Sequence, residues 1–158
     1  MQKDLRRPFF SYLLKLAKKD KDIILLTGDL GYSFIEKFQE ELPNQFINAG
    51  IAEQNATGIA GGLALSGKKP WCYSGTIFML MRPYEQIRNI CYNNLNVKFV
   101  GTGASQFLGF SHNLQKSESE KDLLKNLPIM QWYPETDKQL NATMIYENNH
   151  KGQAFIRL

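Results

Sequence analysis

The sequence is poor in cysteine, and it has neither a long apolar run nor a strong excess of one charge. Its two cysteines, Cys72 and Cys91, lie in the apolar segments WCY and ICY without metal-ligand spacing, which favours small buried residues over a cysteine metal centre. No segment reaches the roughly 20 apolar residues of a membrane span, and the N-terminal MQKDLRRPFF has no apolar signal core. We therefore expect a soluble protein of a reducing compartment, the cytoplasm.

The charge of the chain is weakly basic, with 19 Lys and Arg against 15 Asp and Glu, a formal net charge of +4. No basic stripe with interleaved aromatic residues occurs, so nucleic-acid binding is not expected. The chain has 158 residues, of which 43% are hydrophobic, and it contains no repeat, low-complexity tract or linker. These properties predict a single domain over residues 1–158.

Segments typical of strands alternate with segments typical of helices. Strand-like runs cover 22–29, 45–50, 69–75, 97–103, 129–134 and 153–158. Helical sequence covers 7–19, 33–42, 53–66, 82–95, 118–126 and 135–149. This alternation predicts an α/β fold, a doubly wound and mostly parallel six-stranded sheet with helices on both faces.

One glutamate stands alone in an apolar stretch. The segment FINAGIAEQNATGIAGGLALSG, residues 46–67, has a single charged side chain, that of Glu53. A carboxylate in apolar surroundings is costly unless it is paired or takes up a proton. We expect Glu53 at a helix N-terminus, where the helix dipole favours negative charge, and at the carboxyl edge of the sheet, where ligands bind. The alternative is a solvated or helix-capping glutamate.

Several motifs occur at intervals that match a known family. They are GDL (28–30), the stretch around GIAEQN (46–67), RPYEQIRNICYNNLNVKFVGTG (82–103), LGFSHN (108–113), LPIM (127–130) and AFIRL (154–158). In order and spacing they resemble the pyrimidine-binding domain of the transketolase family over nearly the whole chain.

The resemblance implies that Glu53 hydrogen-bonds N1′ of the aminopyrimidine ring of thiamine diphosphate. In that family the contact shifts the ring towards its imino tautomer, which then takes the C2 proton of the thiazolium and creates the nucleophile that attacks a ketose. Apolar surroundings favour the protonated, hydrogen-bond-donating form of a carboxyl group. The partner that the carboxylate needs would then be a nitrogen of the cofactor.

Further cofactor contacts are implied residue by residue. Asp29 and Leu30 match positions near the cofactor at a dimer interface, although Asp29 is equally a turn residue after a strand. Phe78 matches an aromatic residue that stacks on the pyrimidine, with Tyr84 as a second candidate and a core position as the alternative.

Substrate contacts are implied as well. His112 matches a histidine that contacts the donor substrate and acts in catalysis. Ser33 and Arg157 match positions that bind a sugar phosphate, and Arg6 or Arg7 matches another. Ser33 could equally be the N-cap of the following helix, and Arg157 a surface residue.

The sequence departs from the family in what it lacks. The diphosphate and Mg²⁺ are held in the family by a separate domain with a GDG…N signature, and the only GD here is Gly28-Asp29. The segment TGASQFLGFSHN is shorter than the family's loop and has no acidic residue, so the resemblance does not carry over the substrate specificity of classical transketolases. We expect a diphosphate-binding partner subunit that also holds Mg²⁺, in a heterotetramer or a homodimer-based assembly, whether this chain is naturally separate or a piece of a longer one.

Three functions remain open at this point. The first is the pyrimidine-binding half of a split transketolase-like enzyme that transfers a two-carbon ketol unit between sugars or sugar phosphates. The second is the corresponding half of a related thiamine-diphosphate synthase or decarboxylase. The third is a non-catalytic interaction module that has kept the fold, for which replacing Glu53 with Gln would change little.

Overall fold

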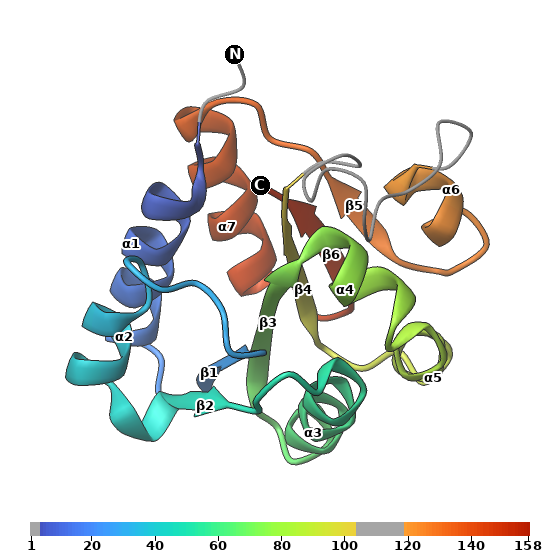
Figure 1. Cartoon of the computed structure of the whole chain (residues 1–158), viewed down its shortest axis with the longest axis horizontal. Helices are drawn as coiled ribbons and strands as arrows, with labels where there is room; N and C mark the ends of the chain where they lie inside the picture. The colour runs from blue at the N-terminus through green and yellow to red at the C-terminus, as the bar shows by residue number, and fades with distance from the viewer. Residues whose placement is uncertain (1–3, 104–118) are drawn as a thin grey trace.

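The structure is a computed structural model that describes residues 4–103 and 119–158, and its centre is one sheet of six parallel strands (Figure 1). The strands are β1 (Ile23–Thr27), β2 (Phe46–Asn48), β3 (Lys69–Gly75), β4 (Lys98–Thr102), β5 (Met130–Trp132) and β6 (Ala154–Arg157). Their order in the sheet is β2-β1-β3-β4-β6-β5. The six expected strands are confirmed, and all five neighbouring pairs are parallel, so the sheet is fully rather than mostly parallel.

Helices cover both faces of the sheet, as expected (Figure 1). They are α1 (Arg6–Ala17), α2 (Glu36–Glu41), the 3-10 turn η1 (Pro43–Gln45), α3 (Glu53–Leu65), α4 (Thr76–Met81), α5 (Tyr84–Tyr92), α6 (Glu120–Leu124) and α7 (Asp137–Asn149). The buried side chains of α1 and α7 share one hydrophobic cluster with one face of the sheet. Those of α3, α4, α5 and α6 share a second cluster with the other face.

The alternation of side chains along β1 supplies both clusters. Ile23 and Leu25 join the cluster under α1 and α7, whereas Ile24 and Leu26 join the cluster under α3 to α6. A strand that is buried on both faces reads as a continuous apolar run because neither set of alternate residues faces water. The five residues of β1 are all buried, which confirms this reading of the run at 22–29.

The connection after β3 differs from the expected one. The sequence pattern predicts one helix over 82–95, but the chain forms α4 first and begins α5 at Tyr84. Pro83 is the N-cap residue between them, at φ −99° and ψ 28°, and because a proline has no N–H to donate, it fits a helix start. As a result, the carboxyl end of β3 leads directly into a short apolar helix.

Both cysteines are buried, as expected. Burial raises the pKa of the Cys72 thiol to about 12 and that of Cys91 to about 11, so neither is a reactive thiolate. In the part of the chain that the structure describes, no helix is long and apolar enough to cross a membrane.

The topological switch point of the sheet lies at β1, which pairs with β2 on one side and with β3 on the other. In open parallel sheets, the loops that leave such a switch point diverge and form a crevice at the carboxyl edge of the strands. The segments that leave β1, β2 and β3 start at this edge: Asp29 follows β1, Glu53 begins α3 after β2, and Phe78 lies in α4 after β3.

A glycine in the central strand β4 allows close packing with α4. A Cβ atom on Gly101 would lie 2.7 Å from Thr76 Oγ1 and 3.0 Å from a ring carbon of Phe155. We therefore expect Gly101→Ala to lower the free energy of unfolding by about 1–3 kcal/mol, because a packed core must shift to admit the methyl group.

Urea denaturation of the purified chain measures this loss, and Gly62→Ala in α3 is the matched control. A Cβ atom on Gly62 meets nothing within 4 Å, so alanine there should raise stability by about 0.5–1 kcal/mol through helix propensity. Equal midpoints for the two variants would show that the contact at Gly101 does not limit packing.

Candidate functional site

The carboxylate of Glu53 is buried at the N-terminus of α3 and is paired within the chain. Its side chain is 4% exposed, and Arg82 Nη1 lies 2.8 Å from Oε1 and 2.9 Å from Oε2. The Arg82 side chain is itself 37% exposed and approaches from the turn between α4 and α5. Glu53 is thus buried as expected. The partners expected from the sequence were the helix dipole and a cofactor nitrogen, and the structure adds Arg82 as a partner within the chain.

The same arginine covers the ring of Phe78. The guanidinium carbon of Arg82 lies 4.1 Å from the centroid of that ring, four residues earlier in the chain. The ring also packs on the end of β3, since a Cβ atom on Gly75 would lie 3.1 Å from it. Arg82 therefore connects the predicted acidic residue with the predicted stacking residue, and it holds both at the carboxyl edge of the sheet.

An open depression of about 600 Å³ lies in front of this pair. Its lining is formed by Ile51, Ala52, Glu53, Gln54, Asn55 and Arg82. Behind the carboxylate is the exit of β1, where a Cβ atom on Gly28 would lie 3.8 Å from Glu53 Oε1 and 3.4 Å from Gly50 O. These are ordinary van der Waals distances, so residue 28 packs directly against the carboxylate.

Asp29 follows Gly28 but points into the loop network rather than towards Glu53. Its carboxylate accepts hydrogen bonds from the Tyr32 hydroxyl at 2.6 Å and the Asn48 amide at 3.2 Å, and Asn48 in turn accepts from the Asp29 N–H. The Tyr32 hydrogen bond, followed by that of Asn48, lowers the pKa of Asp29. Asp29 has a φ of 57°, so the turn reading is supported, while cofactor contact stays a prediction.

The remaining predicted cofactor residues have different surroundings. Leu30 is half-buried and packs on the cluster under α1 and α7. Tyr84 is half-buried at the start of α5 and packs on the opposite cluster, so of the two aromatic candidates only Phe78 shares a contact partner with Glu53. The predicted substrate residue His112 lies outside the residues that the structure describes.

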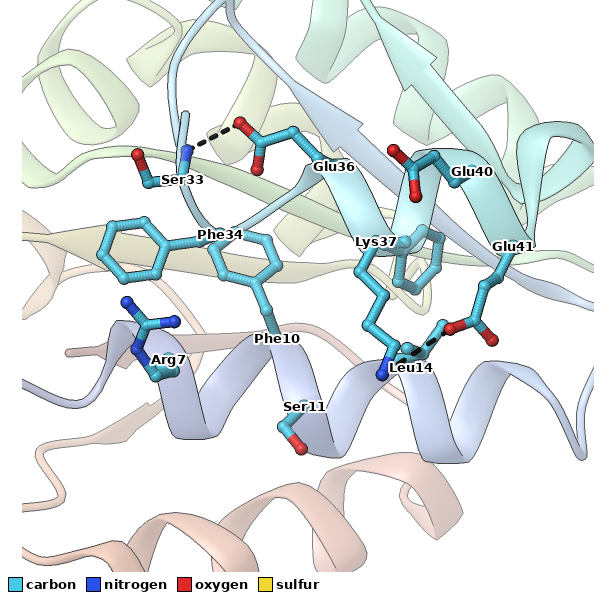
Figure 2. A pocket seen from close by; sticks show the side chains of 11 residues that line it. Arg7, Phe10, Ser11, Leu14, Ser33, Phe34, Glu36, Lys37, Glu40 and Glu41 are labelled. Carbon is cyan, nitrogen blue, oxygen red and sulfur yellow. Dashed lines mark hydrogen bonds and ion pairs between the residues drawn. The ribbon is translucent and has the colours of Figure 1, made fainter.

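Ser33 and Arg7 line one pocket, of about 520 Å³, between α1 and α2 (Figure 2). Figure 2 shows the Arg7 guanidinium directed at Phe34, and the Arg6 and Arg7 guanidinium carbons lie 4.7 and 5.4 Å from the centroid of that ring. The Ser33 N–H donates to the Glu36 carboxylate at 2.7 Å. The N-cap of α2 is Ile35, so the alternative that Ser33 caps this helix is wrong.

The structure does not bring Arg157 to that pocket. Arg157 ends β6, and its guanidinium lies 5.9 Å from the ring of Tyr133, which packs on the cluster under α3 to α6. Ser33 and Arg7 therefore form one polar group and Arg157 belongs to another. The predicted phosphate roles of all three stay predictions.

Sequence reasoning missed Arg82. A signal was present, because a lone carboxylate in an apolar stretch calls for a cation, and Arg82 follows Phe78 by one helical turn. Asn48 was missed as well, although an asparagine at the end of a strand often bonds the neighbouring loop.

The fold is a parallel, doubly wound α/β sheet, with a buried glutamate and an aromatic ring that share one arginine at its carboxyl edge, the edge at which ligands bind in folds of this class. The family described as transketolase, pyrimidine binding domain, matches residues 2–158. The chain belongs to this family.

Relatives in this family differ in the reactions for which they are named. The chain is 34% identical over 157 residues to the 6-deoxy-6-sulfo-D-fructose transketolase subunit SqwH of Clostridium sp. (strain MSTE9), covering 98% of this chain and 49% of that protein. It is 37% identical over 136 residues to a 1-deoxy-D-xylulose-5-phosphate synthase of Bacillus cereus (strain G9842), covering 85% of this chain and 21% of that protein.

A solved structure has the same fold in half of its chain. The split gene transketolase in an inactive β4 tetramer matches with a TM-score of 0.85 at 33% identity, covering 97% of this chain and 50% of that one. The chain thus spans about half the length of this structure and of the sulfofructose transketolase subunit.

Proposed function

We propose that this chain is the pyrimidine-binding subunit of a split, thiamine-diphosphate-dependent transketolase-like enzyme that transfers a two-carbon ketol unit between sugars or sugar phosphates. The observation that carries the proposal is the Glu53 carboxylate, 4% exposed, at the edge of an open depression and one arginine away from the ring of Phe78. Membership of the transketolase pyrimidine-binding family supports it.

The residues present fit the aminopyrimidine end of the cofactor. A carboxyl group and a flat apolar ring at one edge can bind the ring nitrogen and the ring face of a small heterocycle. Two buried hydroxyl groups at the exit of β3, those of Ser74 and Thr76, have no hydrogen-bond partner among the described residues and could serve further polar atoms. When bound, thiamine diphosphate supplies the carbon nucleophile that ketol transfer requires.

Within this half-site Glu53 would hold or pass a proton at the ring nitrogen. Its burial excludes water, which makes a hydrogen bond to a ligand electrostatically stronger than it would be at the surface. Phe78 would orient the ring by contact with its face. The partial positive charge at the N-terminus of α3 would stabilise the Glu53 carboxylate whenever it is ionised.

A second subunit would complete the site. In the family a separate domain with a GDG…N signature holds Mg²⁺ and the diphosphate, and the only GD of this sequence is Gly28-Asp29, so we assign both groups to the partner. The relative SqwH is named as a subunit, and the β4 tetramer of the split gene transketolase is described as inactive. A heterotetramer or a homodimer-based assembly would supply the missing half.

The contact surface of that assembly would involve residues 29–33, 50–62 and 75–90. Large apolar side chains are exposed in each of these segments, with Tyr32 at 62%, Ile51 at 75% and Met81 at 49% exposure. Apolar side chains gathered around a binding site are typical of interfaces.

Sugar phosphate is a substrate class that the pocket of Ser33 and Arg7 fits only in part. Arg7 and Lys37 provide two cations, but three glutamates, Glu36, Glu40 and Glu41, also line the pocket. Glu36 occupies the N–H of Ser33. Phosphate binding there requires that Glu36 releases that N–H, and an unphosphorylated sugar would not require it.

The test is reconstitution. The chain is purified under mild conditions with Mg²⁺, its partner subunit is identified by mass spectrometry, and the assembly is incubated with thiamine diphosphate, a ketose donor and an aldose acceptor. The expected result is a ketose two carbons longer than the acceptor, an aldose two carbons shorter than the donor, and roughly one cofactor per site.

Release of carbon dioxide from a 2-oxo acid donor would instead assign the assembly to the synthases or decarboxylases. An assembly that binds no cofactor and turns over neither donor would reject both enzymes, and a non-catalytic module would remain.

A further inference from the structure

Arg82 makes both contacts that the proposed function assigns to the aminopyrimidine. Its guanidinium donates to the two oxygens of Glu53 at 2.8 and 2.9 Å, and it lies over the ring of Phe78 at 4.1 Å. A guanidinium is planar, donates hydrogen bonds in its plane and stacks on aromatic faces. An aminopyrimidine is also planar, hydrogen-bonds through its edge and stacks through its face, so the two groups compete for one place.

The ion pair is asymmetric in exposure. Glu53 is fixed at the start of α3 with 4% of its side chain exposed, whereas 37% of the Arg82 side chain faces solvent. The carboxylate cannot leave, but the arginine can rotate out into water and recover its hydration. Glu53 borders an open depression and the N-terminus of α3, so water, the helix dipole and a ligand can together take the place of the guanidinium.

We propose that Arg82 is a placeholder that occupies the pyrimidine position on Glu53 and Phe78 in the ligand-free chain, and that cofactor binding requires its displacement. This inference rests on the proposed function, since it presupposes an aminopyrimidine ligand. It makes Arg82 a positioning residue that keeps the buried carboxylate paired until the ligand arrives. In the free chain the guanidinium blocks Glu53 and Phe78, and both become accessible only when a ligand that binds them more strongly replaces it.

Competition of this kind has a measurable consequence. The apparent affinity of a ligand is reduced by the fraction of molecules whose site is open. If the pair is closed nine-tenths of the time, removal of the arginine should tighten binding about tenfold. A residue that merely supports the fold would give no gain in affinity, and a residue that contacts the bound cofactor would give a loss.

The experiment uses the full isolated chain and thiamine, which carries the aminopyrimidine but lacks the diphosphate that the partner would hold. Arg82→Met removes the charge and the hydrogen bonds while keeping an unbranched side chain. Titration calorimetry should show thiamine binding that is about tenfold tighter for Arg82→Met than for the wild type.

Arg88→Met is the matched control. Arg88 lies on α5, is exposed and packs over Tyr92 at 5.1 Å, so the variant changes the net charge equally without touching Glu53. Its affinity for thiamine should equal that of the wild type. A gain shared by both variants would trace to net charge and would overturn the proposal.

Two further outcomes would overturn it. One is an Arg82→Met chain that binds thiamine no better than the wild type, or not at all. The other comes from NMR of the wild type. We expect the nitrogen-bound protons of Arg82 to show hindered guanidinium rotation, and this hindrance to disappear as thiamine is added. Freely rotating protons before addition would contradict a closed pair. Failure of the enzyme proposal is seen separately, as absence of turnover in the reconstituted assembly.

Discussion

Replacing Glu53 with Gln should lower the turnover of the assembled enzyme by about 10²- to 10⁴-fold while leaving the assembly intact. Glutamine has nearly the same size and can still accept a hydrogen bond from Arg82, so the buried site stays filled. An amide does not take up and release a proton at neutral pH, and this is the function that the half-site assigns to the carboxyl group. The measurement is kcat at saturating cofactor and substrates.

Glu135→Gln provides the control, because Glu135 is exposed before α7 and undergoes the same chemical change far from the half-site. Its kcat should match the wild type. Size-exclusion chromatography and cofactor content accompany both variants. Unchanged turnover in Glu53→Gln would favour the non-catalytic module, and loss of assembly would give Glu53 a structural role instead.

The fold was predictable because buried parallel strands carry a plain signal. The run at 22–29 has four consecutive apolar residues, 23–26, and the run at 97–103 is apolar or glycine apart from Lys98 and Thr102; they became β1 and β4, each buried throughout. The helix α4 was not predictable in the same way. Its six residues, TIFMLM, form a short apolar run after a strand, and periodicity does not separate helix from strand over that length.

The candidate site was predictable only in part, for a related reason. Glu53 stands out by local contrast, since it is the single charge in an apolar stretch. Its pairing with Arg82 spans 29 residues and depends on α4, the element that the pattern did not reveal. Tertiary contacts of this kind depend on where elements pack, and a local pattern carries no record of that.

Ser33 shows how backbone conformation overrides a residue-type rule. Serine before an acidic helix is a common N-cap, which made the capping reading reasonable. The residue instead adopts φ 71°, outside the extended range of an N-cap, and donates its N–H to Glu36. The chain turns sharply here to leave β1, and this turn moves the start of α2 to Glu36.

Lys98→Met should be the most destabilising of the substitutions considered, by about 3–5 kcal/mol, because it leaves a buried carboxylate without its ammonium partner. The Lys98 side chain is 3% exposed and that of Glu147 is 0% exposed, with 2.8 Å between Nζ and Oε2. The ammonium also donates to the carbonyl oxygens of Gly152 at 2.6 Å and His150 at 3.1 Å. The free energy of unfolding in urea measures the loss.

The pH dependence of this loss has a defined sign. Burial lowers the pKa of Lys98 below its ordinary value of 10.5, although Glu147 opposes the shift. The unfolded chain therefore binds more protons between the two pKa values, and unfolding free energy should rise with pH towards 10.5 in the wild type. Lys98→Met lacks the titrating group, so its stability should not show this rise.

Two of the chain's ion pairs, Lys98–Glu147 and Arg82–Glu53, can be compared directly. Lys98–Glu147 lies at the start of β4, at the opposite edge of the sheet from Glu53, and neither of its side chains reaches solvent. Arg82→Met leaves Glu53 beside an open depression and at the N-terminus of α3, where water and the helix dipole can replace the lost cation, so it should cost well under half as much stability as Lys98→Met in the same urea experiment. A ligand can displace Arg82 only if breaking its ion pair with Glu53 costs little free energy. If the two losses were equal, Arg82 would be a structural residue and its displacement by a ligand would be too costly to occur.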